Sequence, residues 1–145
     1  MSYFQLKTPR DMLEKSRREH GRLIAEFNID NVFNFFVTAY HIQDYITMAG
    51  SVAPAVLRTF LSGPDLKAAR DMCNKGKHMT LTRGSDPVTN RRTIGPLNTH
   101  PLNTLPINGI RVVWTIYTGS RSFDVAILAQ SVMTKWDTFF AANGL

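Results

Sequence analysis

Only one cysteine, Cys73, occurs in the chain, so neither an internal disulfide framework nor a multi-cysteine zinc site can form. The first residues contain no charged leader followed by an apolar core. The longest apolar-rich stretch is interrupted by Asn34, His41, Gln43 and Asp44, which argues against a membrane-spanning helix. A glycine-rich phosphate loop, a nucleophile elbow and a dinucleotide fingerprint are also missing. We therefore expect a cytoplasmic protein without a cofactor and with no membrane partner.

The composition is that of an ordinary globular protein, with 43% hydrophobic and 19% charged residues. A chain of 145 residues fits one domain, and about two-thirds of the unfolded surface is buried at this size. The sequence thus predicts a single helical-bundle domain over 1–145. Its net charge of +6 favours acidic partners such as nucleic acid.

The first predicted helix covers 9–26. Thr8 supplies an N-cap hydroxyl, Pro9 occupies the first helical position, and Asp11 stands at the capping-box position. Because this segment is mostly polar, we expect it to cover the core from outside.

Apolar spacing predicts three further helices in the first half of the chain. A second helix is expected over 31–48, ended by Gly50, a short third over 52–61, and a fourth over 65–75 that Gly76 stops. The second has the buried stripe Val32, Phe35, Phe36, Ala39, Ile42 and Ile46.

The last helix has the strongest helical pattern in the sequence. Ser122 is expected to cap it, and it should run over 123–142. Its apolar stripe consists of Val125, Leu128, Ala129, Val132, Trp136, Phe139 and Phe140.

Two segments before this helix are typical of strands. Residues 110–117 are rich in β-branched and aromatic side chains, and residues 78–83 alternate in polarity. We expect them to pair. The predicted fold is mainly α: a bundle of four or five helices with a small β-hairpin-like element before the C-terminal helix.

A loop rich in proline and asparagine is predicted over 84–109. It contains a five-residue repeat that begins at Pro96, Pro101 and Pro106, and prolines at this density oppose helices and central strands. Two interpretations are open. The repeat is either a docking strip of a protein-protein adaptor or inhibitor, of the kind that phages and mobile elements carry, or a loop that roofs the core. Its apolar positions are Leu97, Leu102 and Ile107.

The segment 67–92 holds +5 of the chain's +6 charge, from seven cations and two carboxylates. Its cations are Lys67, Arg70, Lys75, Lys77, Arg83, Arg91 and Arg92. This concentration predicts a non-catalytic binding protein for an acidic partner, first of all the backbone of RNA or DNA, with an acidic protein or a nucleotide ligand as alternatives. Without interleaved aromatic residues, binding should depend on the backbone and be poorly sequence-specific. These patterns do not predict an oligomeric state.

One alternative is catalytic and uses Arg70, Asn74 and His78. A histidine can move protons near neutral pH, and an arginine can stabilise a phosphate on which charge builds. The arrangement resembles the HEPN superfamily, helical-bundle domains whose ribonuclease members carry an arginine, a polar residue and then a histidine. Seven residues separate Arg70 from His78, more than that family's usual gap. The resemblance implies a metal-independent ribonuclease with His78 as acid-base, Arg70 on the phosphate and Asn74 orienting it. Alternatively, Arg70 pairs with a carboxylate and His78 begins a strand.

A second constellation consists of His41 and Asp44, three residues apart and therefore on one helix face. With His78 they would form a two-histidine, one-carboxylate metal set. The simpler alternative is a hydrogen bond from His41 to Asp44 or to a neighbour at the edge of the bundle, without a metal. Cys73 is expected to be a small buried hydrophobe.

Overall fold

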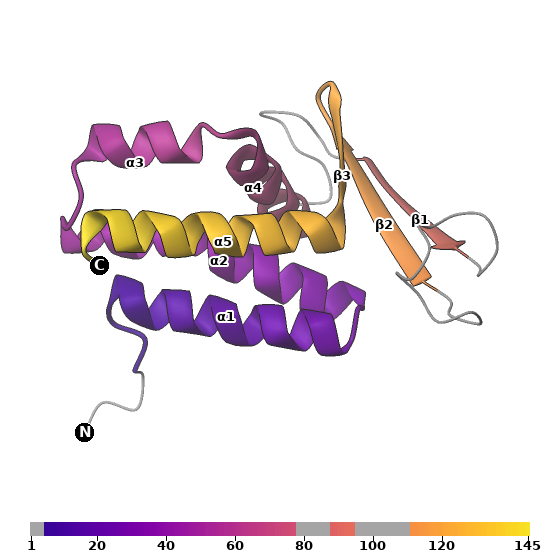
Figure 1. The fold of residues 1–145 in the computed structure, drawn as a ribbon, viewed down its shortest axis with the longest axis horizontal. Helices are drawn as coiled ribbons and strands as arrows, with labels where there is room; N and C mark the ends of the chain where they lie inside the picture. The colour runs from indigo at the N-terminus through magenta and orange to yellow at the C-terminus, as the bar shows by residue number, and fades with distance from the viewer. Residues whose placement is uncertain (1–4, 78–87, 95–110) are drawn as a thin grey trace.

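The computed structural model describes residues 5–77, 88–94 and 111–145 (Figure 1). Its elements are, in chain order, α1 (Pro9–Ala25), α2 (Ile29–Ala49), α3 (Pro54–Leu61), α4 (Pro64–Lys77), β1 (Val88–Ile94), β2 (Arg111–Thr118), β3 (Arg121–Asp124) and α5 (Val125–Asn143). The prediction of a mainly helical fold with a small antiparallel β-element before the last helix is confirmed. Within the described ranges, no helix combines the length and the apolarity that crossing a bilayer requires.

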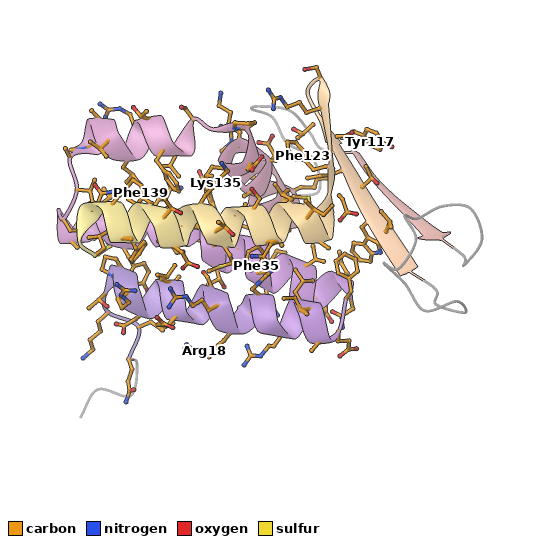
Figure 2. All side chains as sticks on the ribbon, viewed as in Figure 1. Arg18, Phe35, Tyr117, Phe123, Lys135 and Phe139 are labelled. Atoms are coloured by element: carbon orange, nitrogen blue, oxygen red, sulfur yellow. The ribbon has the colours of Figure 1, made fainter. Side chains whose placement is uncertain are left out.

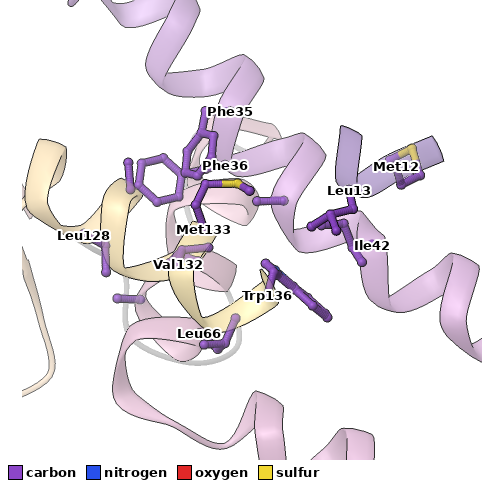
Figure 3. Packing of buried hydrophobic residues seen from close by; sticks show 14 of the residues in the cluster. Met12, Leu13, Phe35, Phe36, Ile42, Leu66, Leu128, Val132, Met133 and Trp136 are labelled. Carbon is purple, nitrogen blue, oxygen red and sulfur yellow. The ribbon is translucent and has the colours of Figure 1, made fainter. Parts of the chain in front are cut away.

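Helix α5 packs against α1, α2 and α4, and α2 likewise packs against α1, α4 and α5. Both apolar stripes predicted from the sequence, on α2 and on α5, are buried along their whole length. Trp136 of α5 is fully buried, and Figure 3 shows it among side chains from α1, α2 and α4. The core is therefore built on the faces that the helical period indicates.

Helix α1 covers this core from outside, as predicted. The Thr8 hydroxyl accepts a hydrogen bond from the Asp11 N–H, and the Asp11 carboxylate accepts one from the Thr8 N–H, which completes the capping box. Met12, Leu13 and Leu23 are buried beneath the helix. Its outer face is polar, which explains its weak apolar pattern.

Two predicted helix boundaries were wrong. Helix α4 continues through Gly76 to Lys77, because one glycine costs only about 1 kcal/mol relative to alanine and α4 packs along α2. Helix α5 is capped by Asp124, whose carboxylate accepts hydrogen bonds from the N–H groups of Ala126 and Ile127. Ser122 cannot serve as that cap because it belongs to β3.

The three strands form one antiparallel sheet with the order β1-β2-β3, at one end of the bundle (Figure 1). Strand β2 pairs with β1, from Val88↔Tyr117 to Ile94↔Arg111, and with β3, from Thr115↔Asp124 to Thr118↔Arg121. The predicted partner, 78–83, lies outside the described residues, as does the proline repeat. The loop predicted over 84–109 was wrong at β1, which forms a strand with β-branched residues at both ends: Val88 and Thr89, and Thr93 and Ile94.

The sheet is joined to the bundle by apolar packing on one face. Ile116 is fully buried and belongs to the hydrophobic core. The ring of Trp114 meets Phe27, beyond the end of α1, edge-on, with 5.2 Å between ring centroids. Figure 2 shows Phe123 at the junction between the hairpin and the bundle. The end of β2 and the start of β3 are thereby held next to α4.

Candidate functional site

Helix α4 has two chemically different faces. Leu66, Ala69 and Cys73 are buried against the core. Lys67, Arg70, Asn74 and Lys77 recur at three- and four-residue spacing, so they form one line along the other face. Lys67 and Lys77 are exposed, and Arg70 and Asn74 are half-buried. We call these four residues the cationic stripe; at 1.5 Å per residue it is about 15 Å long.

At its N-terminal end the stripe opens into a hollow of about 350 Å³ between α4 and the turn that joins β2 to β3. Three cations and three hydroxyl groups line it: Lys67, Arg70 and Arg121, and Ser62, Thr118 and Ser120. Among the described residues, Asp71 is the one carboxylate in the lining. In the described part of the chain, neither Lys67 nor Arg121 has an ion-pair partner. The described part of the lining therefore has three cations against one carboxylate, together with the Ser120 hydroxyl. A surface of this kind suits an anion.

Asp71 is a structural centre of this region and is only 4% exposed. Its Oδ1 accepts hydrogen bonds from Arg70 Nε at 3.1 Å and Nη2 at 2.9 Å, and its Oδ2 accepts one from Thr118 Oγ1 at 2.7 Å. The carboxylate thus joins α4 to the end of β2. The alternative in which Arg70 pairs with a carboxylate is confirmed, although the Arg70 side chain remains 39% exposed at the hollow.

At its C-terminal end the stripe reaches α2. His41 Nδ1 lies 2.6 Å from Asp44 Oδ2, so the predicted hydrogen bond between these two residues is confirmed. On the other side of the ring, Lys77 Nζ contacts His41 Nε2. A neutral imidazole satisfies both contacts when Nδ1–H donates to Asp44 and Nε2 accepts from the ammonium. Lysine, histidine and aspartate therefore form one hydrogen-bonded chain between two helices.

Cys73 lies one turn before Lys77 and is fully buried, as predicted. Burial raises the pKa of its thiol, while the charge and hydrogen bond of Lys77 oppose that rise only in part. The thiol consequently stays protonated at neutral pH. Cys73 is therefore a packing residue, not a nucleophile, and it lies beside the hydrogen-bonded group of Lys77, His41 and Asp44.

The other predicted site residues are distributed differently. Lys75 is half-buried in the last turn of α4. Arg91 and Arg92 were expected on a flexible loop, but they belong to β1, opposite Trp114 and Val113 of β2. His78 and Arg83 lie outside the described residues.

The predicted metal set of His41, Asp44 and His78 has one member outside the described residues. Within 5–77, 88–94 and 111–145, no group of three histidine, cysteine, aspartate or glutamate side chains is placed to hold a metal ion. The two described members instead bind each other and Lys77.

Sequence reasoning missed Arg121 and the contact between Lys77 and His41. Arg121 follows Gly119, whose φ of 60° is typical of a tight turn, so Gly119-Ser120 after a clear strand was a signal for a hairpin. No element was predicted for residues 118–121, and Ser122 was expected to cap the last helix. Lys77 and His41 are 36 positions apart, and no local pattern links them.

Comparison with known proteins found no matching protein-family model, curated protein or solved structure. The features that bear on function are therefore the charge and geometry of the cationic stripe, the hollow and the contacts of His41.

Proposed function

We propose that this chain is a small binding protein that holds a nucleic-acid backbone along the cationic stripe, with one phosphate in the hollow. The observation that carries the proposal is the convergence of Lys67, Arg70 and Arg121 on one hollow. Two of these three cations have no acidic partner among the described residues. Phosphate would supply the charge that this surface lacks.

The chemistry of the lining favours phosphate over other anions. Guanidinium groups donate two parallel hydrogen bonds to phosphate oxygens, and lysine adds a mobile point charge. Arg70 is held in place by Asp71, so little side-chain entropy is lost when it binds. The hydroxyl of Ser120 adds a donor at the rim, whereas the hydroxyl of Ser62 donates to the Thr59 carbonyl.

The length of the stripe favours a polymer over a single nucleotide. From Lys67 to Lys77 it extends about 15 Å, well beyond the reach of one phosphate. Phe123 is the only aromatic residue that the described part of the chain contributes to the lining of the hollow, and it is half-buried. Without exposed rings for base stacking there, we expect binding to be driven by the backbone and nearly independent of sequence.

The test is a fluorescence-anisotropy titration with short labelled single strands of RNA and DNA at several salt concentrations. Lys67→Glu and Arg121→Glu should each weaken binding, and loss of one phosphate contact should lower the slope of log affinity against log salt by about 0.7. Free mononucleotide should compete poorly.

Arg18→Glu is the matched control, because Arg18 is exposed on the outer face of α1, away from α4 (Figure 2). It makes the same change in net charge without touching the hollow. Wild-type binding that does not weaken with salt would overturn the proposal. So would a loss of affinity in Arg18→Glu equal to that in Lys67→Glu.

A further inference from the structure

His41 lies where the cationic stripe ends against α2, and it is held from both sides. Asp44 Oδ2 is 2.6 Å from Nδ1, and Lys77 Nζ contacts Nε2. The side chain of His41 keeps 32% of its surface exposed and that of Asp44 keeps 56%, while Lys77 is exposed. A ligand on the stripe can therefore reach the imidazole.

This arrangement has the parts of a general acid-base centre. A carboxylate on Nδ1 fixes the tautomer whose Nε2 lone pair can accept a proton. Lys77 has three donors on a flexible stem, so its ammonium can move from Nε2 to a phosphate oxygen when a strand binds. The base, its orienting group and a cation for the phosphate are then all at one point.

We propose that His41 and Lys77 are catalytic residues for metal-independent cleavage of RNA, with Asp44 as a positioning residue. The inference rests on the proposed function, because the stripe must bring the backbone to His41. It differs from the HEPN pattern, which uses Arg70 and His78, because here the histidine is His41 and the cation beside it is Lys77.

The chemical step balances without an outside reagent. His41 Nε2 takes the proton of a ribose 2′-hydroxyl, and the 2′-oxygen attacks the adjacent phosphorus. The bond from phosphorus to the 5′-oxygen breaks, and that oxygen takes a proton from the Lys77 ammonium. The products are a 2′,3′-cyclic phosphate and a free 5′-hydroxyl. The imidazolium then returns its proton to the Lys77 amine through the contact between Nε2 and Nζ, which restores the starting state.

The experiment measures cleavage and binding separately on the same single-stranded RNA, with chelator present. The wild type should release products ending in a cyclic phosphate and should leave an all-deoxy strand uncut. His41→Ala should lower the cleavage rate by about 10²–10⁴-fold with nearly unchanged affinity, and free imidazole should restore part of the rate. Lys77→Ala should lower it by about 10²–10³-fold. Asp44→Asn should lower kcat more than it changes KM, and Asp44→Glu should recover part of the loss.

His20→Gln is the matched control, because His20 lies on α1 against Phe35 with 5.3 Å between ring centroids, away from the stripe. It should cleave like the wild type when purified in the same way. The inference is overturned if RNA binds but stays intact, a result that leaves the proposed function standing. It is also overturned if chelator stops cleavage, or if His78→Ala abolishes cleavage while His41→Ala does not. Absence of any RNA binding would instead remove the proposed function itself.

Discussion

Glu19 shows how a single buried charge makes the stability of this bundle depend on pH. It is 5% exposed on α1, and its Oε1 accepts hydrogen bonds from Lys15 at 3.1 Å and Arg22 at 2.7 Å. Burial raises the pKa of Glu19, but hydrogen bonds and charge from the two cations outweigh it, so the pKa lies below its ordinary value. The folded state therefore binds fewer protons than the unfolded chain. The stability that Glu19 contributes is present above the ordinary pKa and lost as the pH falls.

We predict that Glu19→Gln lowers the free energy of unfolding at pH 7 by about 1–3 kcal/mol. The difference from the wild type should shrink as the pH drops below about 4.3, where the unfolded carboxyl is protonated. Urea unfolding at a series of pH values measures both effects. Glu14→Gln is the control, because Glu14 pairs with Arg17 at the surface and should change stability by less than about 0.5 kcal/mol. A gap between Glu19→Gln and wild type that stays constant with pH would contradict the assignment.

The helices are the elements that sequence periodicity predicts best. The stripes of α2 and α5 were identified correctly because each helix buries one continuous face, and that face is a local property of the chain. The boundary at Gly76 was wrong because the packing of α4 on α2 outweighs a modest loss in helix propensity. The strands that pair with β2, β1 and β3, were not predicted, because strand pairing depends on contacts that are not local.

Two glycines on neighbouring helices should respond oppositely to the same substitution. Gly21 lies inside α1, and an added Cβ would meet no atom within 4 Å. Gly21→Ala should therefore stabilise the protein by about 0.5–1 kcal/mol. Gly50 ends α2 with φ of 61°, so Gly50→Ala should destabilise it by roughly 1–2 kcal/mol. Thermal unfolding of both variants measures this, and shifts of the same sign would be inconsistent with the two backbone conformations.

At the scale of the whole molecule, the candidate site could be only half predicted. The concentration of charge on α4 is visible in the sequence, so Lys67 and Arg70 were found. Arg121 contributes to the same hollow from the start of β3, and Lys77 contacts His41 from another helix. Such contacts exist only after folding has brought distant segments together. Charge counting predicts the presence of a basic surface but not its geometry.

The bundle and the sheet each contain one tryptophan, which allows their unfolding to be followed separately. Trp136 is in the bundle core, and Trp114 lies on the sheet against Phe27. Because Ile116 belongs to the common core and Asp71 bonds Thr118, we predict one cooperative transition. Fluorescence of Trp114→Phe and Trp136→Phe, each compared with far-ultraviolet circular dichroism of the same variant, should give coincident midpoints in urea. Loss of the Trp114 signal before the helical signal would show that the sheet unfolds on its own.

The junction at Asp124 has a mechanical consequence. Asp124 is both the last residue of β3 and the N-cap of α5, so no linker separates the hairpin from α5. We therefore expect a rotation of the hairpin to be transmitted directly to the first turn of α5. A nucleic-acid strand bound at the β2–β3 turn would thus alter the environment of α5, the helix that contains Trp136. The hairpin and the buried face of α5 are thus directly coupled through Asp124.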